Sequence, residues 1–114
     1  MDERLEKALN YSNYMVTFNN QKRIAKEKFL DSRYFYLNGG KFFSSIELIN
    51  YLSFLVNKGI TDTIVLDENE NPIKVENLTE FIDNIQHTYF FALNEYYQTL
   101  TQLKSSRKVE KLVE

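Results

Sequence analysis

The N-terminal third of the chain carries a helical pattern of apolar side chains. Residues 2–38 contain neither Gly nor Pro, and heptad-spaced positions in this stretch are apolar or aromatic in seven of nine cases. These positions are Ala8, Tyr11, Met15, Phe18, Lys22, Ala25, Phe29, Ser32 and Tyr36. The spacing predicts one long helix. A polar run from Thr17 to Arg23 allows a bend near Asn19-Asn20, and Asn38-Gly39-Gly40 is predicted to end the helix, because Gly adopts the left-handed conformation that closes helices.

The middle of the chain reads as a short strand followed by a helix. Lys41-Phe42-Phe43 is β-prone, and Ser44 with Glu47 forms a capping-box pattern, which satisfies the free N–H groups at a helix start. The helix is predicted to run to Lys58 and to stop at Gly59. Its broad apolar stripe is Leu48, Ile49, Leu52, Leu55 and Val56.

A β-hairpin is predicted next. Residues 63–66 and 73–75 are rich in β-branched side chains and flank a polar turn that contains Pro72. Pro72 has no N–H to donate, so it belongs in the turn or at the first position of the second strand. With residues 41–43 added, the pattern allows a three-stranded antiparallel sheet.

A second long helix is predicted for the rest of the chain. Asn77 and Glu80 form a capping pair, and no Gly or Pro follows. One apolar face comprises Leu78, Ile82, Ile85, Tyr89, Ala92, Tyr96, Thr99 and Leu103. A second face carries Phe90, Leu93, Tyr97 and Leu100.

These elements predict a single domain over residues 1–114, of mostly helical α+β class. The predicted order is long helix, short strand, helix, β-hairpin, long helix, with the two long helices packed antiparallel. A helix of about 35 residues is about 50 Å long, which exceeds the radius of gyration of about 13 Å expected for a compact domain of this size. Part of that length must project, bend or pack on another chain.

Composition narrows the function classes. The chain is 43% hydrophobic and 26% charged, with a net charge of −2, and therefore lacks the basic surplus of a general polyanion binder. The absence of Cys excludes disulfides and thiolate zinc sites and fits a cytoplasmic protein. The charged N-terminus does not resemble a signal peptide, and no apolar run is long enough for a membrane span. Asn, Lys, Ile, Phe and Tyr, whose codons are AT-rich, are abundant, so we expect an AT-rich genome to account for part of the aromatic content of 15%.

No pattern of catalytic or metal-binding residues emerges, and we expect a non-enzymatic protein without cofactor or metal. The acidic turn at residues 67–71 has Pro72 and Leu78 where a calcium loop needs Gly and Glu. His87 could pair with Asp83 one turn earlier, but nothing supplies the nucleophile of a triad. A helix C-cap explains the glycines before Lys41 better than a phosphate loop does.

Charge is unevenly distributed along the chain. Residues 22–33 include Lys22, Arg23, Lys26 and Lys28, and residues 104–111 carry four bases and one acid. Residues 62–83 carry seven acids and one base. Such runs are usually solvated helix faces. The alternative is a basic strip beside aromatic side chains that binds single-stranded nucleic acid.

Several stretches together carry a family resemblance. They are residues 10–23 (NYSNYMVTFNNQKR), Asn38-Gly39-Gly40 and residues 104–113 (KSSRKVEKLV). The pattern resembles a small uncharacterised protein of T4-like marine phages of the cyanophage type. The resemblance implies an accessory or virion-associated protein in the host cytoplasm and carries over no functional residue.

The resulting hypothesis is a helix-mediated interaction or oligomerisation protein. Between Tyr89 and Tyr97, apolar side chains surround nearly the whole helix and leave Asn94 and Glu95 as the polar sector. We therefore expect a homo-oligomer, most simply a dimer, formed through Phe90, Leu93, Tyr97 and Leu100. A further protein partner is compatible with this surface. Binding of single-stranded nucleic acid is the alternative.

Overall fold

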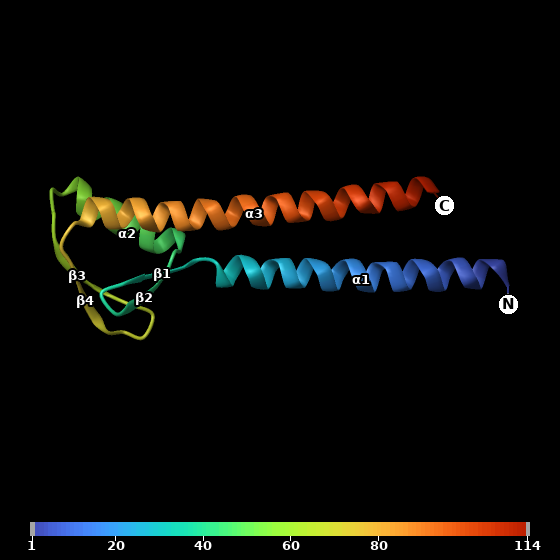
Figure 1. The fold of residues 1–114 in the computed structure, drawn as a ribbon, viewed down its shortest axis with the longest axis horizontal. Coiled ribbons are helices and arrows are strands. Elements are labelled where there is room, and N and C mark those ends of the chain that lie inside the picture. Colours follow the sequence, from blue (N-terminus) through green and yellow to red (C-terminus); the bar gives the residue numbers. More distant parts are fainter. Residues whose placement is uncertain (1, 114) are drawn as a thin grey trace.

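The computed structural model describes residues 2–113, with side chains described through residue 105. It contains three helices and four short strands (Figure 1). In chain order these are α1 (Glu3–Asp31), β1 (Tyr34–Leu37), β2 (Gly40–Phe43), α2 (Ile46–Asn57), β3 (Thr63–Leu66), β4 (Pro72–Val75) and α3 (Leu78–Val113). The molecule measures 69 × 24 × 18 Å. Its elongated shape divides into a two-helix arm and a head that contains α2 and the strands.

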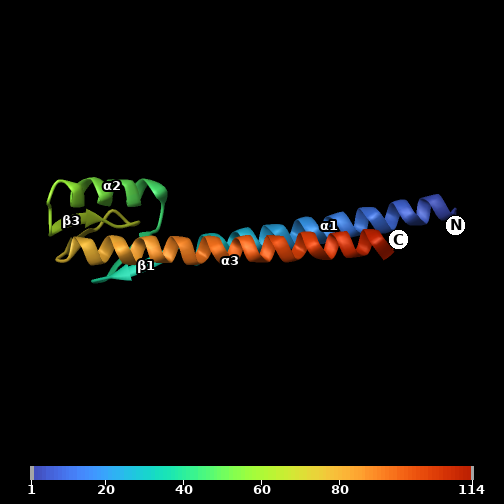
Figure 2. The same cartoon turned by 90° about the horizontal axis from the view of Figure 1, so that it is seen from above.

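The arm consists of α1 and about the last two-thirds of α3, which lie side by side and run in opposite directions (Figures 1 and 2). This confirms the predicted α+β class and the antiparallel packing of the long helices. The heptad positions Ala25 and Phe29 of α1 meet Ala92 and Tyr96 of α3. Helix α1 continues without a break through Asn19-Asn20, where the sequence allowed a bend or a break.

The first helix ends earlier than predicted. It stops at Asp31 rather than near Asn38, and β1 follows, which the sequence pattern did not predict. Asn38 and Gly39 have positive φ angles of 51° and 80° and form the two-residue turn between β1 and β2. These are the residues that such a tight hairpin turn prefers. The assignment of this segment as a helix C-cap was therefore wrong.

The strands form two separate hairpins instead of one three-stranded sheet. Strand β1 pairs with β2, and β3 pairs with β4, both antiparallel. The β3–β4 hairpin and the place of Pro72 at the start of β4 agree with the prediction. The hairpins meet where Glu68 donates a backbone hydrogen bond to Lys41. A Cβ at Gly40 would lie 2.6 Å from a side-chain atom of Ile73, so a larger residue there would displace the Ile73 side chain.

Helix caps fix the starts of α2 and α3. The Ser45 hydroxyl accepts a hydrogen bond from the Leu48 N–H, so the cap of α2 is one residue later than the predicted Ser44. Ser44 is instead buried. At the start of α3, the predicted pair is confirmed: the side chain of Asn77 accepts from the Glu80 N–H at 3.1 Å.

The main hydrophobic core lies in the head, between α2, the strands and the first two turns of α3. Its buried side chains are Phe42, Leu52, Leu55, Val65, Val75, Leu78, Phe81, Ile82 and Ile85. The ring of Phe81 makes an edge contact with Phe42 and a tilted contact with Phe35. This core packs against the first turns of α3, and the rest of that helix extends from it into the arm.

Candidate interaction surface on the helical arm

The arm is only two helices thick, so each helix can bury just one stripe of its surface. Among the described arm residues, only Ala25 and Ala92 are buried. Several large apolar side chains of both helices remain exposed on the outside of the arm. A surface helix normally needs only one apolar stripe, and additional exposed apolar side chains indicate an interaction surface when they are contiguous.

The second face of α3 is contiguous in this sense, and we call it the ridge, defined as Phe90, Leu93, Tyr97 and Leu100. The exposed fractions are 55% for Phe90, 36% for Leu93 and 70% for Tyr97, and Leu100 is half-buried. At about 100° per residue the four side chains occupy about 80° of arc. The structure therefore leaves Phe90 and Tyr97 mostly open to solvent and Leu93 and Leu100 partly so.

The ridge continues the side of α3 that α2 covers in the head. Ile82 and Leu100 are about five helical turns apart and project in the same direction, and Ile82 is buried with Leu52 and Leu55 of α2. Figure 2 shows α2 beside about the first third of α3. The twelve residues of α2 extend about 18 Å, enough to cover α3 only to about Phe90. Beyond that level no element of the described chain covers the ridge.

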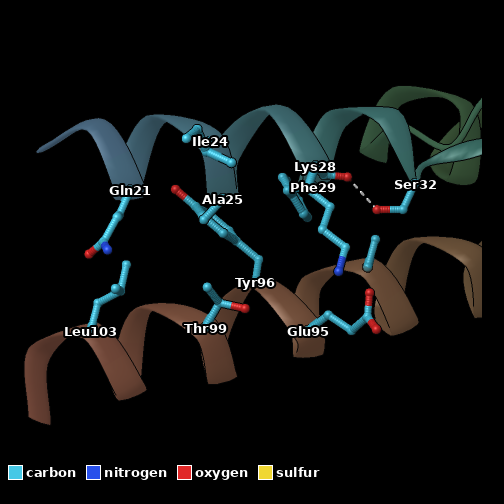
Figure 3. Close-up of a pocket in the computed structure, with 11 residues that line it drawn as sticks. Gln21, Ile24, Ala25, Lys28, Phe29, Ser32, Glu95, Tyr96, Thr99 and Leu103 are labelled. Atoms are coloured by element: carbon cyan, nitrogen blue, oxygen red, sulfur yellow. Dashed lines mark hydrogen bonds between the residues drawn. The ribbon is translucent and has the colours of Figure 1, made fainter. Parts of the chain in front are cut away.

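The opposite face of the arm contains a groove between α1 and α3 (Figure 3). Its volume is about 300 Å³, and it lies beside the stacked rings of Phe29 and Tyr96. Ala25, Ala92 and Leu103 contribute apolar surface, and Lys28 and Glu95 provide one charge of each sign. The groove was not predicted. Its signal in the sequence is the pair of small heptad residues Ala25 and Ala92, which leave space between the helices.

The predicted basic strip is divided between two faces of α1. Lys22 and Lys26 lie one turn apart on the same face as the ridge, whereas Lys28 lies about 120° or more away and lines the groove. Arg23 pairs with Glu27 at 2.8 Å. Of the four strip residues, only Lys22 and Lys26 therefore remain as cationic neighbours of the ridge. The side chains of the second basic segment lie mostly outside the described residues.

Arg33 fixes the junction of arm and head, and sequence reasoning did not identify it. Its guanidinium carbon lies 4.3 Å from the centre of the Phe43 ring, 4.8 Å from Phe29 and 5.1 Å from Tyr89. Its Nε donates a hydrogen bond to the backbone oxygen of Ser44. Each contact of this kind between a cation and an aromatic ring contributes about 0.5–2 kcal/mol of stability. Arg33 thus links α1, β2 and α3.

Two ionisable groups of the head, Asp67 and His87, make contacts that support the fold. Burial raises the pKa of Asp67, but hydrogen bonds from the backbone N–H groups of Asn71, Lys41 and Asn69 outweigh this effect and hold the pKa below 3.8. His87, which helical spacing would allow to pair with Asp83, stacks on Phe91, with ring centroids 6.4 Å apart. Within the described residues no three potential metal-ligand side chains come together.

Comparison with known proteins adds no functional assignment. No protein-family model, curated protein or solved structure matches the chain. Within residues 2–113, no helix has both the length and the apolar character that crossing a bilayer requires. Function is therefore inferred from the ridge and its surroundings.

Proposed function

We propose that the chain is a non-enzymatic self-association protein in which a second copy covers the ridge. The supporting observation is the exposure of Phe90, Leu93 and Tyr97 as one contiguous face on a two-helix arm. Packing two such arms together forms a four-helix arrangement, in which the apolar ridge becomes core. The resemblance to a T4-like phage protein would make this an accessory or virion-associated protein that acts in the host cytoplasm.

The size of the arm fits a stable dimer. Helix α1 has 29 residues, or about 43 Å of length, and two adjacent helices are about 20 Å wide. One face of the arm therefore offers roughly 800 Å², which is about the area that each partner contributes to a specific interface of standard size. The aromatic side chains at its centre are of the type that dominates binding energy in such interfaces.

The test is to replace Phe90, Leu93 and Tyr97 with Gln and to measure mass by light scattering coupled to size-exclusion chromatography. We expect the parent chain to be a dimer and the triple variant to be a folded monomer with unchanged helical circular dichroism. A matched control replaces Val16, Ile24 and Phe91, which are similarly exposed but project from other faces of the arm, and should leave the dimer intact. A parent chain that is monomeric at micromolar concentration contradicts the proposal.

One observation favours a second candidate, binding of single-stranded nucleic acid. Lys22 and Lys26 lie on the same face as the aromatic side chains of the ridge. Aromatic rings that stack on bases beside cations that contact phosphates are the usual elements of such a surface. The acidic residues of the head repel the phosphates of a nucleic acid, so we place this function second.

A further inference from the structure

The two hairpins of the head leave one edge of each strand unpaired. Such an edge presents backbone N–H and C=O groups that a further strand can bind. In an antiparallel pair, successive residues direct these groups alternately toward the partner strand and away from it. Asp67 donates its backbone N–H to Asn71 at the end of the β3–β4 ladder, so the backbone groups of Ile64 and Leu66 are directed away from β4.

Two of the other edges are covered. On β2, the backbone N–H and C=O of Lys41 are both bonded to the turn between β3 and β4. On β4, the side chain of Asn38 donates a hydrogen bond to the backbone oxygen of Lys74, and Pro72 has no N–H to offer. Contacts of this kind prevent a sheet edge from pairing with other chains.

The edge of β3 is open. Within the described residues, nothing is hydrogen-bonded to the outward backbone groups of Ile64 or Leu66. These residues are 60% and 62% exposed, whereas Val65 between them is buried. The strand has the sequence Thr-Ile-Val-Leu and lacks the Lys or Pro that usually protects an edge. The remaining strand, β1, lies against α3, and its outward residue Tyr34 is half-buried.

The charge around β3 selects the kind of segment that can bind there. Asp62 precedes the strand, Glu68 follows it, and both are exposed. Residues 62–83 carry seven acids and one base, and that base, Lys74, is already paired with Asp62 at 2.9 Å. A basic segment is therefore attracted to this edge and an acidic one is repelled.

This chain does not itself supply a suitable strand. Its basic stretches, residues 22–33 and 104–111, lie almost entirely in α1 and α3, so they are helical rather than extended. The β3 edge of a second copy carries the same acids and is repelled. The strand that completes this edge must therefore come from another protein.

We propose that the open edge of β3 binds an extended basic segment of another protein as an added strand. The backbone of that segment pairs with the outward groups of Ile64 and Leu66. Its side chains alternate between the two faces of the hairpin, so apolar side chains at alternate positions lie beside these two residues. Lys or Arg at its ends lies beside Asp62 and Glu68. The surface belongs to the head and uses no ridge residue, so the proposal is independent of self-association.

The probe for this proposal is the peptide Lys-Thr-Val-Thr-Val-Thr-Lys, which matches the order acid, apolar, apolar, acid along β3. Amide hydrogen exchange of the isotopically labelled chain, followed by NMR, reports the pairing at each residue. We expect exchange at Ile64 and Leu66 to slow by about tenfold or more when the peptide is near saturation. Val65 should be unchanged, because its N–H is already directed to β4.

Two modified peptides separate backbone pairing from charge. Replacing both Lys of the peptide with Glu should weaken binding by about tenfold at low salt. Methylating the central backbone N–H groups of the peptide keeps its charge but removes its donors, and should abolish the protection. Equal binding by either modified peptide overturns the proposal.

Matched variants of the protein locate the edge. Leu66→Pro removes an outward N–H without removing a bond to β4 and should weaken peptide binding several-fold. Tyr36→Pro makes the same change on the edge of β1 and should leave binding unchanged, as should the ridge triple variant. Circular dichroism checks that each variant is folded, and the exchange measurement on the parent chain decides the proposal even where a Pro variant does not fold.

Three results of the exchange measurement overturn the proposal. The first is the absence of protection at Ile64 and Leu66 with the Lys peptide at millimolar concentration. The second is protection at Tyr34 and Tyr36 instead, which assigns the added strand to β1. The third is protection at Ile64 and Leu66 without peptide that increases with protein concentration, which shows that a second copy occupies the edge.

Discussion

The ring of Phe29 in α1 stacks on the ring of Tyr96 in α3, with ring centroids 4.9 Å apart and ring planes inclined by 20°. This aromatic contact joins the two arm helices beside the groove. The guanidinium of Arg33 lies over the same Phe29 ring at 4.8 Å. Phe29 therefore connects the arm contact to the junction with the head.

We expect the Phe29–Tyr96 pair to contribute a coupling energy of about 0.5–1.5 kcal/mol beyond the area it buries. A double-mutant cycle with Phe29→Leu and Tyr96→Leu, followed by urea unfolding, measures this coupling. The matched control cycle uses the neighbouring Tyr97, which projects from the ridge, in place of Tyr96 and should give a coupling near zero. Equal coupling in both cycles would show that the stacking does not act specifically.

Two adjacent serines at the start of α2 should respond oppositely to replacement by Ala. Ser45→Ala removes the N-cap hydrogen bond to Leu48 and should destabilise the fold by about 1 kcal/mol. Ser44→Ala should be neutral or slightly stabilising, because the buried Ser44 hydroxyl has no hydrogen-bond partner among the described residues. Thermal unfolding of both variants compares them directly. If Ser44→Ala lowered the thermal stability more than Ser45→Ala, the N-cap of α2 would be Ser44, as the sequence predicted.

The periodic parts of the fold could be predicted from the sequence, because they depend on local patterns. The heptad stripe of α1, the Asn77–Glu80 cap and the β3–β4 hairpin each have a strong local signal. Strand β1 was missed because Ser32 and Tyr36 extend the heptad spacing of α1 into residues that form no helix. The stronger signal was Asn38-Gly39 between aromatic runs, which is typical of a tight hairpin turn.

The candidate site was predictable only in part. The direction of the ridge follows from helical periodicity, so Phe90, Leu93, Tyr97 and Leu100 could be grouped from the sequence. Periodicity also separates Lys28 from Lys22 and Lys26, which the sequence prediction overlooked. The reach of α2 along α3 depends on tertiary packing in the head, and no local pattern reveals it. The role of Arg33 likewise depends on rings that come from three elements.

Asp67 should make the stability of the head depend on pH. Its pKa is lowered in the folded chain, so its contribution is complete above the unfolded value of 3.8 and is lost as the pH falls through the folded value. We expect Asp67→Asn to be less stable than the parent at neutral pH, with the difference shrinking below pH 3.8. Thermal unfolding as a function of pH measures this. A difference that stays constant over the whole range would contradict the assignment.

Asp62 provides the control for this prediction. Its pKa is also lowered, by the hydrogen bond and the charge of Lys74 at 2.9 Å, but both side chains are more than half exposed. Salt should therefore abolish the effect of Asp62→Asn, since exposed ion pairs are screened. The effect of Asp67→Asn should persist in salt, because backbone N–H groups hold that carboxylate.

The last prediction concerns nucleic acid and decides between the two proposed functions. We expect the parent chain to bind a single-stranded oligonucleotide weakly and to release it at about 0.2 M salt. The double variant Lys22→Glu, Lys26→Glu should abolish this binding while leaving the dimer mass unchanged. Lys28→Glu combined with Lys7→Glu makes the same change of net charge away from the ridge face and should have a smaller effect. Fluorescence anisotropy of a labelled oligonucleotide gives the affinity as a function of salt. Tight binding by the parent chain at about 0.2 M salt contradicts this expectation. If that binding is lost both in the ridge triple variant and in Lys22→Glu, Lys26→Glu, the ridge is a nucleic-acid surface. Binding that disappears equally in Lys22→Glu, Lys26→Glu and in Lys28→Glu, Lys7→Glu reflects net charge alone, and self-association then stays the function that the ridge supports.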